Sequence, residues 1–433
     1  MKRELKKYIT LNILAMTGTS CYILADTFFI SMAEGAGGIT ALNLVLPIYG
    51  IIYAIGSMVG IGSATRYTLE KSVGDRGADD YFSNSIWFSL LLSIPFLVSG
   101  VLFPDRILSL LGADEQILGI GLSYIRIVLC CAPFFMVNYT FTAFARNDSA
   151  PRLAMLATLG SGIFNIIFDY ILMFPLDMGM AGAALATGIS PLVSVIICLC
   201  HYLSKNNTVV FSRKMPSVKK LLSACGLGIA AFVSELSSGI TTLVFNFILL
   251  GLAGNLAVAS YGVIANIALV ASALFNGISL GLQPVASSAH GRTDPWEEKK
   301  IYRYSLKIGL AIAVLSIIAV MLFGDAFIRI FNSGQSRELA AYASVGVRLY
   351  FLGFLVSAVN VIKSGFYSAI GKGRESSVIA VSRGIVTITL MAFLLSKVFG
   401  VVGVWLAFGA SETITWLLSI VMEKAFRKKA QGS

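Results

Sequence analysis

The chain has 433 residues, of which 57% are hydrophobic and only 13% are charged, whereas soluble domains are usually about one-quarter charged. The apolar residues come in runs of about 20, the length that crosses a hydrocarbon core, so this composition excludes a water-soluble fold and indicates a membrane protein. The net charge of +11 does not indicate nucleic-acid binding, because the basic residues are spread over short connections.

The predicted elements are twelve transmembrane helices, divided by a polar connection at 204–219 into two sets of six. The first set is expected at 8–31, 39–63, 82–103, 117–144, 153–174 and 180–203, and the second at 220–251, 256–284, 302–324, 339–370, 376–398 and 401–423. The first segment is too long for a cleavable signal sequence, so we interpret it as a retained span. The sequence thus predicts an N-terminal lobe at 1–203, a cytoplasmic linker at 204–219 and a C-terminal lobe at 220–433.

The basic residues predict the orientation. Most of the 33 Lys and Arg residues lie in the connections on one side of the predicted membrane, and the opposite connections hold only Arg106, Arg329, Arg337 and Lys397. Cytoplasmic loops carry such an excess of positive charge. We therefore expect a multi-pass protein of the plasma (inner) membrane with both termini in the cytoplasm.

The two halves repeat. The segment 179–190 matches 400–411 at six of twelve positions, and Gly60 and Gly281 share the same offset of 221 residues. Six spans is an even number, so both halves enter the membrane in the same direction. This predicts an all-α membrane fold of two pseudo-symmetric six-helix lobes, related by an axis along the membrane normal, with a cavity between them.

Three polar side chains lie inside predicted spans of the first half. Asp26 lies in the first span, and Asn165 and Asp169 share one face of the fifth because they are four residues apart. Two carboxylates brought close favour the binding of one proton, and an amide oxygen adds a neutral ligand for Na⁺. Intramembrane acids are usually functional, although a helix–helix hydrogen bond or a position near the outer interface remains the alternative.

In the second half we single out Glu235 in the seventh span, with Asn246 and Asn360, as a candidate site for substrate or a second cation. The alternative for Glu235 is an acid near the cytoplasmic end that is bonded to neighbouring serines. Arg348 and Lys363 in the tenth span either pair with Glu235 or extend to an interface, and we favour the second for Lys363.

Other chemistries lack their motifs. The six cysteines have no metal-ligand spacing, the two histidines adjoin no nucleophile motif, and no phosphate-binding or dinucleotide-binding loop is present. We therefore expect neither an enzyme nor a cofactor, and transport that draws on an ion gradient.

Two motifs carry a resemblance to a known family. They are the segment 25–30 (Ala-Asp-Thr-Phe-Phe-Ile) and the stretch from Phe144 to Ser190, which holds Arg146-Asn-Asp-Ser-Ala-Pro151, then Asn165-Ile-Ile-Phe-Asp169 and Gly179-Met-Ala-Gly182. On these residues the sequence resembles the multidrug and toxic compound extrusion (MATE) family. The resemblance implies a cation-coupled antiporter that works by alternating access, exports cationic or amphipathic compounds and uses H⁺ or Na⁺ as coupling ion.

The resemblance also implies where the ion binds. A polar cluster in the N-terminal lobe of family members corresponds here to Asp26, Tyr124, Asn165, Asp169 and Thr187. Another branch of the family uses acids in helices 7 and 10. Glu235 matches the first of these, but Val359 and Asn360 stand where the second is expected, so we prefer the N-terminal cluster.

Three alternatives stay open at this point. A lipid-linked precursor flippase of the same superfamily would need a cationic cavity, for which Arg126, Arg348, Lys363 and Arg383 are the residues to examine. An intramembrane enzyme would need a His or Ser/Lys centre, which we do not find. A receptor that transports nothing would leave both the duplication and the buried acids unexplained. The expected partners are the bilayer and small cationic or amphipathic substrates, without nucleic acid, and the expected state is a monomer.

Overall fold

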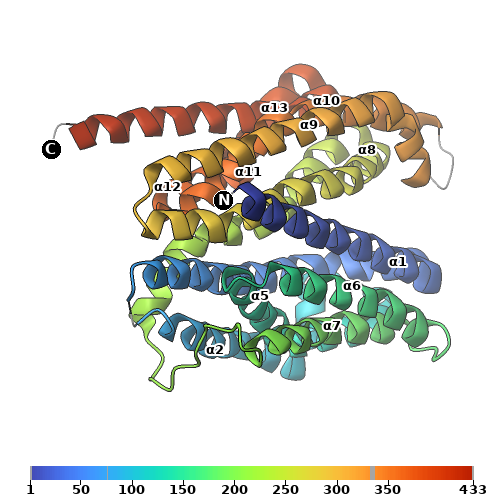
Figure 1. Cartoon of the computed structure of the whole chain (residues 1–433). Helices are drawn as coiled ribbons and strands as arrows, with labels where there is room; N and C mark the ends of the chain where they lie inside the picture. The colour runs from blue at the N-terminus through green and yellow to red at the C-terminus, as the bar shows by residue number, and fades with distance from the viewer. Residues whose placement is uncertain (1, 76, 332–336, 432–433) are drawn as a thin grey trace.

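The computed structural model describes residues 2–75, 77–331 and 337–431, and within these ranges the fold is all-helical. The N-terminal half contains α1 (Lys2–Ser72), α2 (Asp80–Leu102), α3 (Pro104–Leu110), α4 (Glu115–Cys130), α5 (Ala132–Asn147), α6 (Pro151–Met173) and α7 (Gly179–Tyr202). The C-terminal half contains α8 (Val218–Gly291), α9 (Pro295–Phe331), α10 (Arg337–Leu352), α11 (Phe354–Ala369), α12 (Gly373–Val381), a π-helical turn η1 (Ser382–Val386) and α13 (Thr387–Gln431). Figure 1 shows these halves as two stacked helical bundles, with the first part of α1 between them.

The number of spans agrees with the sequence. Among the described residues, nine helices are long and apolar enough to cross a membrane, or eleven when the bent pairs α4–α5 and α10–α11 each count as one span. The segment Gly373–Lys424 counts as one helix in that total although it turns sharply at Gly400. Dividing it there gives twelve spans, and the predicted twelve-helix fold is confirmed.

Glycines mark equivalent turns in the two halves. Gly35 and Gly254, with φ of 59° and 68°, separate the first and second spans of each lobe. Gly179 and Gly400, with φ of 48° and 59°, precede the last span of each lobe. Only glycine adopts such positive φ without steric cost, so the repeated motif seen in the sequence is a structural repeat.

The lobes contact each other through α1 and α8, near the cavity that the N-terminus and the 203–217 connection line together. A Cβ atom on Gly228 of α8 would lie 2.1 Å from the carbonyl oxygen of Met58 on α1, and one on Gly281 would lie 2.7 Å from Cα of Ile9. These distances are too short for any side chain. The lobes are therefore held together at this end by close backbone packing of α1 on α8.

Candidate functional site

The site is centred on two carboxyl groups from different helices. Asp26 on α1 is half-buried, and Asp169 on α6 is fully buried. Their carboxyl groups are close enough to share a hydrogen bond. Within the described chain, no N–H or O–H donor reaches Oδ1 of Asp26 or either carboxylate oxygen of Asp169. Two charged carboxylates in this position repel each other, so the pair needs a shared proton or a bound cation.

Asn165 lies one helical turn before Asp169 and extends the same polar face. Its Nδ2 donates to Oγ1 of Thr187 on α7 at 3.0 Å, which leaves the buried Oδ1 without a donor. Asn165 Oδ1, Asp26 Oδ1 and both carboxylate oxygens of Asp169 are thus buried acceptors that receive no hydrogen bond from the described chain. Oxygen ligands of this kind suit a proton or Na⁺ better than a soft metal ion.

Glycines bring these three helices together. A Cβ on Gly162 of α6 would lie 3.0 Å from the ring of Tyr22 on α1. A Cβ on Gly182 of α7 would lie 2.9 Å from the backbone of Leu172 on α6. The second glycine of the repeated motif therefore allows α7 to pack closely on α6, which places Thr187 beside Asn165.

Tyr124 on α4 is buried behind the carboxyl pair. Its hydroxyl lies 3.4 Å from that of Tyr49, and the charges of Asp26 and Asp169 are close enough to act on it. The structure thus brings all five residues predicted for the N-terminal cluster to one region: Tyr124 contacts Tyr49, Asn165 donates to Thr187, and Asp26 lies beside Asp169. Their role in ion binding stays a prediction.

A row of tyrosines connects this cluster with the C-terminal lobe. Tyr22 lies close to Tyr53, and the ring of Tyr53 lies 6.0 Å from that of Tyr139, edge to face. The hydroxyl of Tyr139 on α5 donates to Oε1 of Glu235 on α8 at 3.2 Å. Glu235 thus bonds across the lobe interface, while Ser238 reaches only its backbone oxygen.

Sequence reasoning missed these tyrosines. Tyr49 and Tyr53 are four residues apart, so their rings stack on one face of α1, with centroids 5.7 Å apart. That spacing was a usable signal. The sequence carries no comparable signal for the contact of Tyr139 with Glu235, because that contact depends on how α5 packs against α8.

The other two residues of the predicted C-terminal site lie apart from this contact. Asn246 is on the same helix as Glu235, and its Oδ1 is buried without a donor in the described chain. Asn360 donates to the carboxylate of Glu412 at 2.7 Å. Glu412, in the last span, is only 1% exposed, and sequence reasoning overlooked it.

The basic residues inside the spans are dispersed. Arg348 pairs with Asp325 at 3.0 Å, and Arg383 pairs with Glu412 at 2.5 Å. Lys363 is buried and lies 3.3 Å from the partly exposed Glu423 at the end of the last span, so its extension to an interface stays a prediction. Neither Arg348 nor Lys363 pairs with Glu235, and Arg126 is exposed on α4. These four residues do not form the cationic cavity that a phosphate-carrying substrate requires.

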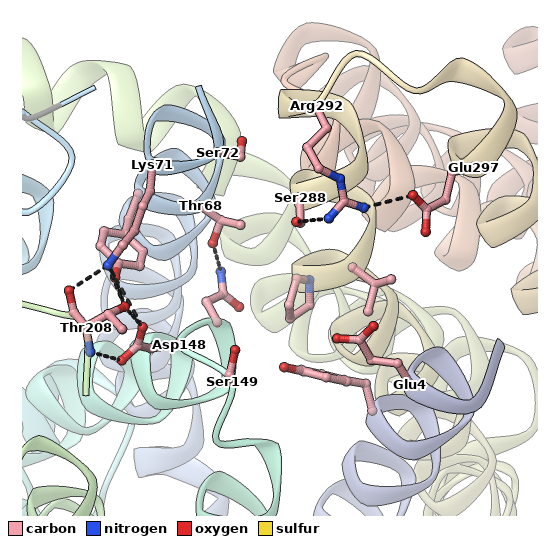
Figure 2. A pocket seen from close by; sticks show the side chains of 15 residues that line it. Glu4, Thr68, Lys71, Ser72, Asp148, Ser149, Thr208, Ser288, Arg292 and Glu297 are labelled. Carbon is pink, nitrogen blue, oxygen red and sulfur yellow. Dashed lines mark hydrogen bonds and ion pairs between the residues drawn. The ribbon is translucent and has the colours of Figure 1, made fainter. Parts of the chain in front are cut away.

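A separate cavity of about 260 Å³ lies between the lobes at the end that carries the N-terminus, and Figure 2 shows its lining. On one wall Asp148 binds Nε2 of His201 and the backbone N–H of Thr208, each at 2.8 Å. On the other, Arg292 binds Glu297 at 2.8 Å. The cavity includes no residue of the carboxyl pair, and Asp148 ties the 203–217 connection to the N-terminal lobe.

Comparison with known proteins agrees with this architecture. The MatE family model matches residues 12–171 and 230–394, which is most of the chain. The chain belongs to the MatE family. MatE proteins are transporters rather than enzymes, so the predictions of the family and of a non-enzyme are confirmed.

Curated relatives of this MatE chain span nearly its whole length. It is 26% identical over 411 residues to the "Multidrug export protein MepA" of Staphylococcus saprophyticus, with 94% of this chain and 90% of the relative covered. The MepA of Staphylococcus haemolyticus is 27% identical over 413 residues with the same coverage.

Solved structures share the fold. A crystal structure of "MATE in complex with MaL6" has a TM-score of 0.92 at 21% identity and covers 100% of this chain and 97% of its own. An "outward-facing conformation of a multidrug resistance MATE family transporter" has a TM-score of 0.90 at 22% identity and covers 99% and 97%.

Proposed function

We propose that this MatE chain is a secondary-active exporter of cationic or amphipathic compounds, and that the carboxyl pair of Asp26 and Asp169 holds the coupling H⁺ or Na⁺. The observation that carries the proposal is a pair of neighbouring carboxyl groups in which Oδ1 of Asp26 and both oxygens of Asp169 are buried and receive no donor from the described chain. Such a pair accepts one mobile cation, and that cation changes the charge of the site. The names of the MepA relatives support export of drugs as the transported flux.

The transport cycle follows from competition for charge. A substrate cation enters from the cytoplasm between the lobes, where Glu235 and the tyrosine row offer negative charge and aromatic faces. Aromatic rings attract cations, and Tyr53 and Tyr139 are half-buried. The lobes then rock so that the site faces outward, and an entering H⁺ or Na⁺ neutralises the carboxyl pair and displaces the substrate. Return of the lobes releases the ion inside.

The orientation belongs to the same proposal. The excess of basic residues on one side supports a plasma-membrane protein whose termini and 203–217 connection lie on the cytoplasmic side. The closely packed end of the lobes is then the cytoplasmic end. We infer that one chain suffices for transport, because every element of the proposed site lies within it.

Export of a fluorescent lipophilic cation from energised cells that lack their own exporters tests this function. We expect Asp169→Asn and Asp26→Asn each to raise dye accumulation to the level of cells without the protein, because an amide does not take up the coupling cation. Asp177→Asn is the matched control, since Asp177 is exposed in the connection between α6 and α7 and has φ of 50°, which asparagine also adopts. Normal export by Asp169→Asn at equal expression would refute the proposed site.

Vesicles with imposed gradients distinguish the two ions. An inward-directed pH gradient without Na⁺ drives dye transport if the coupling ion is H⁺, and an inward-directed Na⁺ gradient at uniform pH drives it if the ion is Na⁺. A lipid-linked precursor flippase is not supported, because Arg348, Lys363 and Arg383 have acidic partners within the C-terminal lobe.

A further inference from the structure

The C-terminal lobe contains its own buried polar cluster, between its fifth and sixth spans. In the N-terminal lobe the fifth and sixth spans, α6 and α7, carry Asn165, Asp169 and Thr187, and the first span carries Asp26. In the C-terminal lobe the fifth span comprises α12, η1 and the start of α13, and the sixth is the part of α13 that follows Gly400. Arg383 on η1 and Glu412 after Gly400 meet between these two spans.

Glu412 is surrounded by donors. Nη2 of Arg383 binds its Oε1 at 2.5 Å, and Nε lies 3.0 Å and 3.2 Å from the two carboxylate oxygens. Nδ2 of Asn360 donates to Oε2 at 2.7 Å. Nη2 of Arg383 also donates to Oγ of Ser357 at 2.9 Å. Tyr350 on α10 is a further titratable side chain close enough to feel the charges of the pair.

The backbone at Arg383 is adapted to this contact. Arg383 lies in the π-helical turn η1, and such turns often occur at functional sites. The next residue, Gly384, packs against α8 so closely that a Cβ there would lie 2.5 Å from Cβ of Ser237. The extra residue of the π-turn and the close approach to α8 together fix the direction in which Arg383 leaves the helix.

The two lobes therefore balance charge differently. The N-terminal cluster has two acids without a basic partner in the described chain, whereas the C-terminal cluster has one acid with a guanidinium bound to it. Asn360 adds a buried Oδ1 to which the described chain donates nothing. We propose that the Arg383 guanidinium is a tethered cation occupying a cation site formed by Glu412, Asn360 and Ser357, so that only the N-terminal lobe takes up a mobile ion.

This proposal has a direct chemical consequence. Removal of the guanidinium leaves the buried carboxylate with only Nδ2 of Asn360 as a side-chain donor, and a buried charge does not stay without a counter-charge. Carboxylate oxygens accept H⁺ or Na⁺. A variant without the Arg383 charge therefore gains a binding site for one monovalent cation. The statement that the N-terminal lobe binds the coupling ion rests on the proposed function. The expectation that a variant without the Arg383 charge binds a cation at Glu412 does not.

Thermal unfolding of the purified full-length protein tests the gain. Wild type, Arg383→Gln and Arg383→Gln/Glu412→Gln are compared in Na⁺ and in choline, each at mildly acidic and mildly alkaline pH. The N-terminal cluster is the same in all three proteins, so its response cancels in the comparison. We expect the melting temperature of Arg383→Gln alone to respond more strongly than that of wild type, by about 2 °C or more. The additional rise occurs on replacing choline with Na⁺ if the new site binds Na⁺, and on lowering the pH if it binds H⁺.

Two results would overturn the proposal. One is an Arg383→Gln protein that responds to Na⁺ and pH as wild type does, and the other is a gain that persists in the double variant without Glu412. Arg383→Met, which keeps an unbranched apolar stem, is the second variant if Arg383→Gln does not fold. If either variant can be purified in folded form only in the presence of Na⁺ or at acidic pH, that result also indicates a new cation site. Because no substrate or export is involved, a negative result here leaves the proposed export function untouched.

Discussion

At the scale of single residues, Oδ1 of Asp26 and both carboxylate oxygens of Asp169 are buried and receive no donor from the described chain. A structural acid in a membrane normally finds a basic partner or several N–H donors, as Glu412 finds Arg383. The carboxyl pair of the N-terminal lobe has neither within the described chain. This difference supports a mobile cation at the first site and a fixed one at the second.

The charge of Glu235 should matter for charged substrates and not for neutral ones. Glu235→Gln keeps the size of the side chain and an oxygen that accepts from Tyr139. We expect the KM for a permanently cationic dye to rise about tenfold, equal to about 1.4 kcal/mol, and the KM for a neutral amphipathic substrate to stay nearly constant. Transport assays with both substrates measure this, and Glu338→Gln, an exposed position, is the control. An equal change for both substrates would contradict a charge-based role.

Much of the candidate site was predictable at this scale. Asn165 and Asp169 share a helix face by their spacing alone, and the motifs around Asp26 and Thr187 indicated the remaining members. Contacts between helices from different motifs were not predictable. Glu412 went unnoticed because an acid in the last span has no local signal of its partner, and the bond from Tyr139 to Glu235 exists only once the two lobes are packed.

At the scale of elements, paired glycines set the geometry of each lobe. Gly179 and Gly400 reverse the chain with positive φ, and Gly182 and Gly403 then allow the last span to touch the end of the one before it. A Cβ on Gly403 would lie 1.9 Å from the carbonyl oxygen of Leu395. The sequence repeat predicted close packing, and the structure adds that the first glycine of each motif forms the turn itself.

Gly182→Ala should therefore loosen α7 from α6. The added methyl group would meet the backbone of Leu172 at 2.9 Å, and such overpacking costs about 1–3 kcal/mol. We expect a lower melting temperature and weaker export, because Thr187 shifts away from Asn165. Gly119→Ala on α4 is the control, since nothing lies within 4 Å of a Cβ there. Equal melting temperatures for the two variants would show that the contact is not needed.

At the scale of the whole molecule, the lobes touch through α1 and α8, with backbone against backbone at Met58 and Gly228 and at Ile9 and Gly281. Leu5, Tyr8 and Ile9 of α1 also pack into the hydrophobic core of the C-terminal lobe. The sequence predicted two lobes and their orientation from hydropathy and charge. It did not predict that the start of α1 packs with the opposite lobe. A helix that is apolar on several faces shows no periodicity of hydrophobic residues that would indicate which lobe it contacts.

Gly228→Ala should separate the lobes at this end. The methyl group would lie 2.1 Å from the carbonyl oxygen of Met58, so the closed contact becomes unfavourable and the proposed cytoplasmic side opens. Cys225 is half-buried on the same helix and reports the opening when the other cysteines are replaced by alanine. We expect a maleimide to label it several-fold faster in Gly228→Ala than in Gly239→Ala, a position with no atom within 4 Å of a Cβ. Equal labelling rates for the two variants would show that the contact of Gly228 with Met58 does not keep this end of the lobes closed.

The central claim is that substrate and coupling ion compete for the charge of Asp26 and Asp169. Its most direct test is ion release from the purified protein on addition of a cationic substrate, followed with a pH indicator in weak buffer and with a Na⁺-selective electrode. We predict release of about one H⁺ or Na⁺ per bound substrate from wild type, and none from Asp26→Asn/Asp169→Asn at substrate concentrations that saturate both proteins. Undiminished release from the double variant would contradict the account, because the displaced ion would then come from another site.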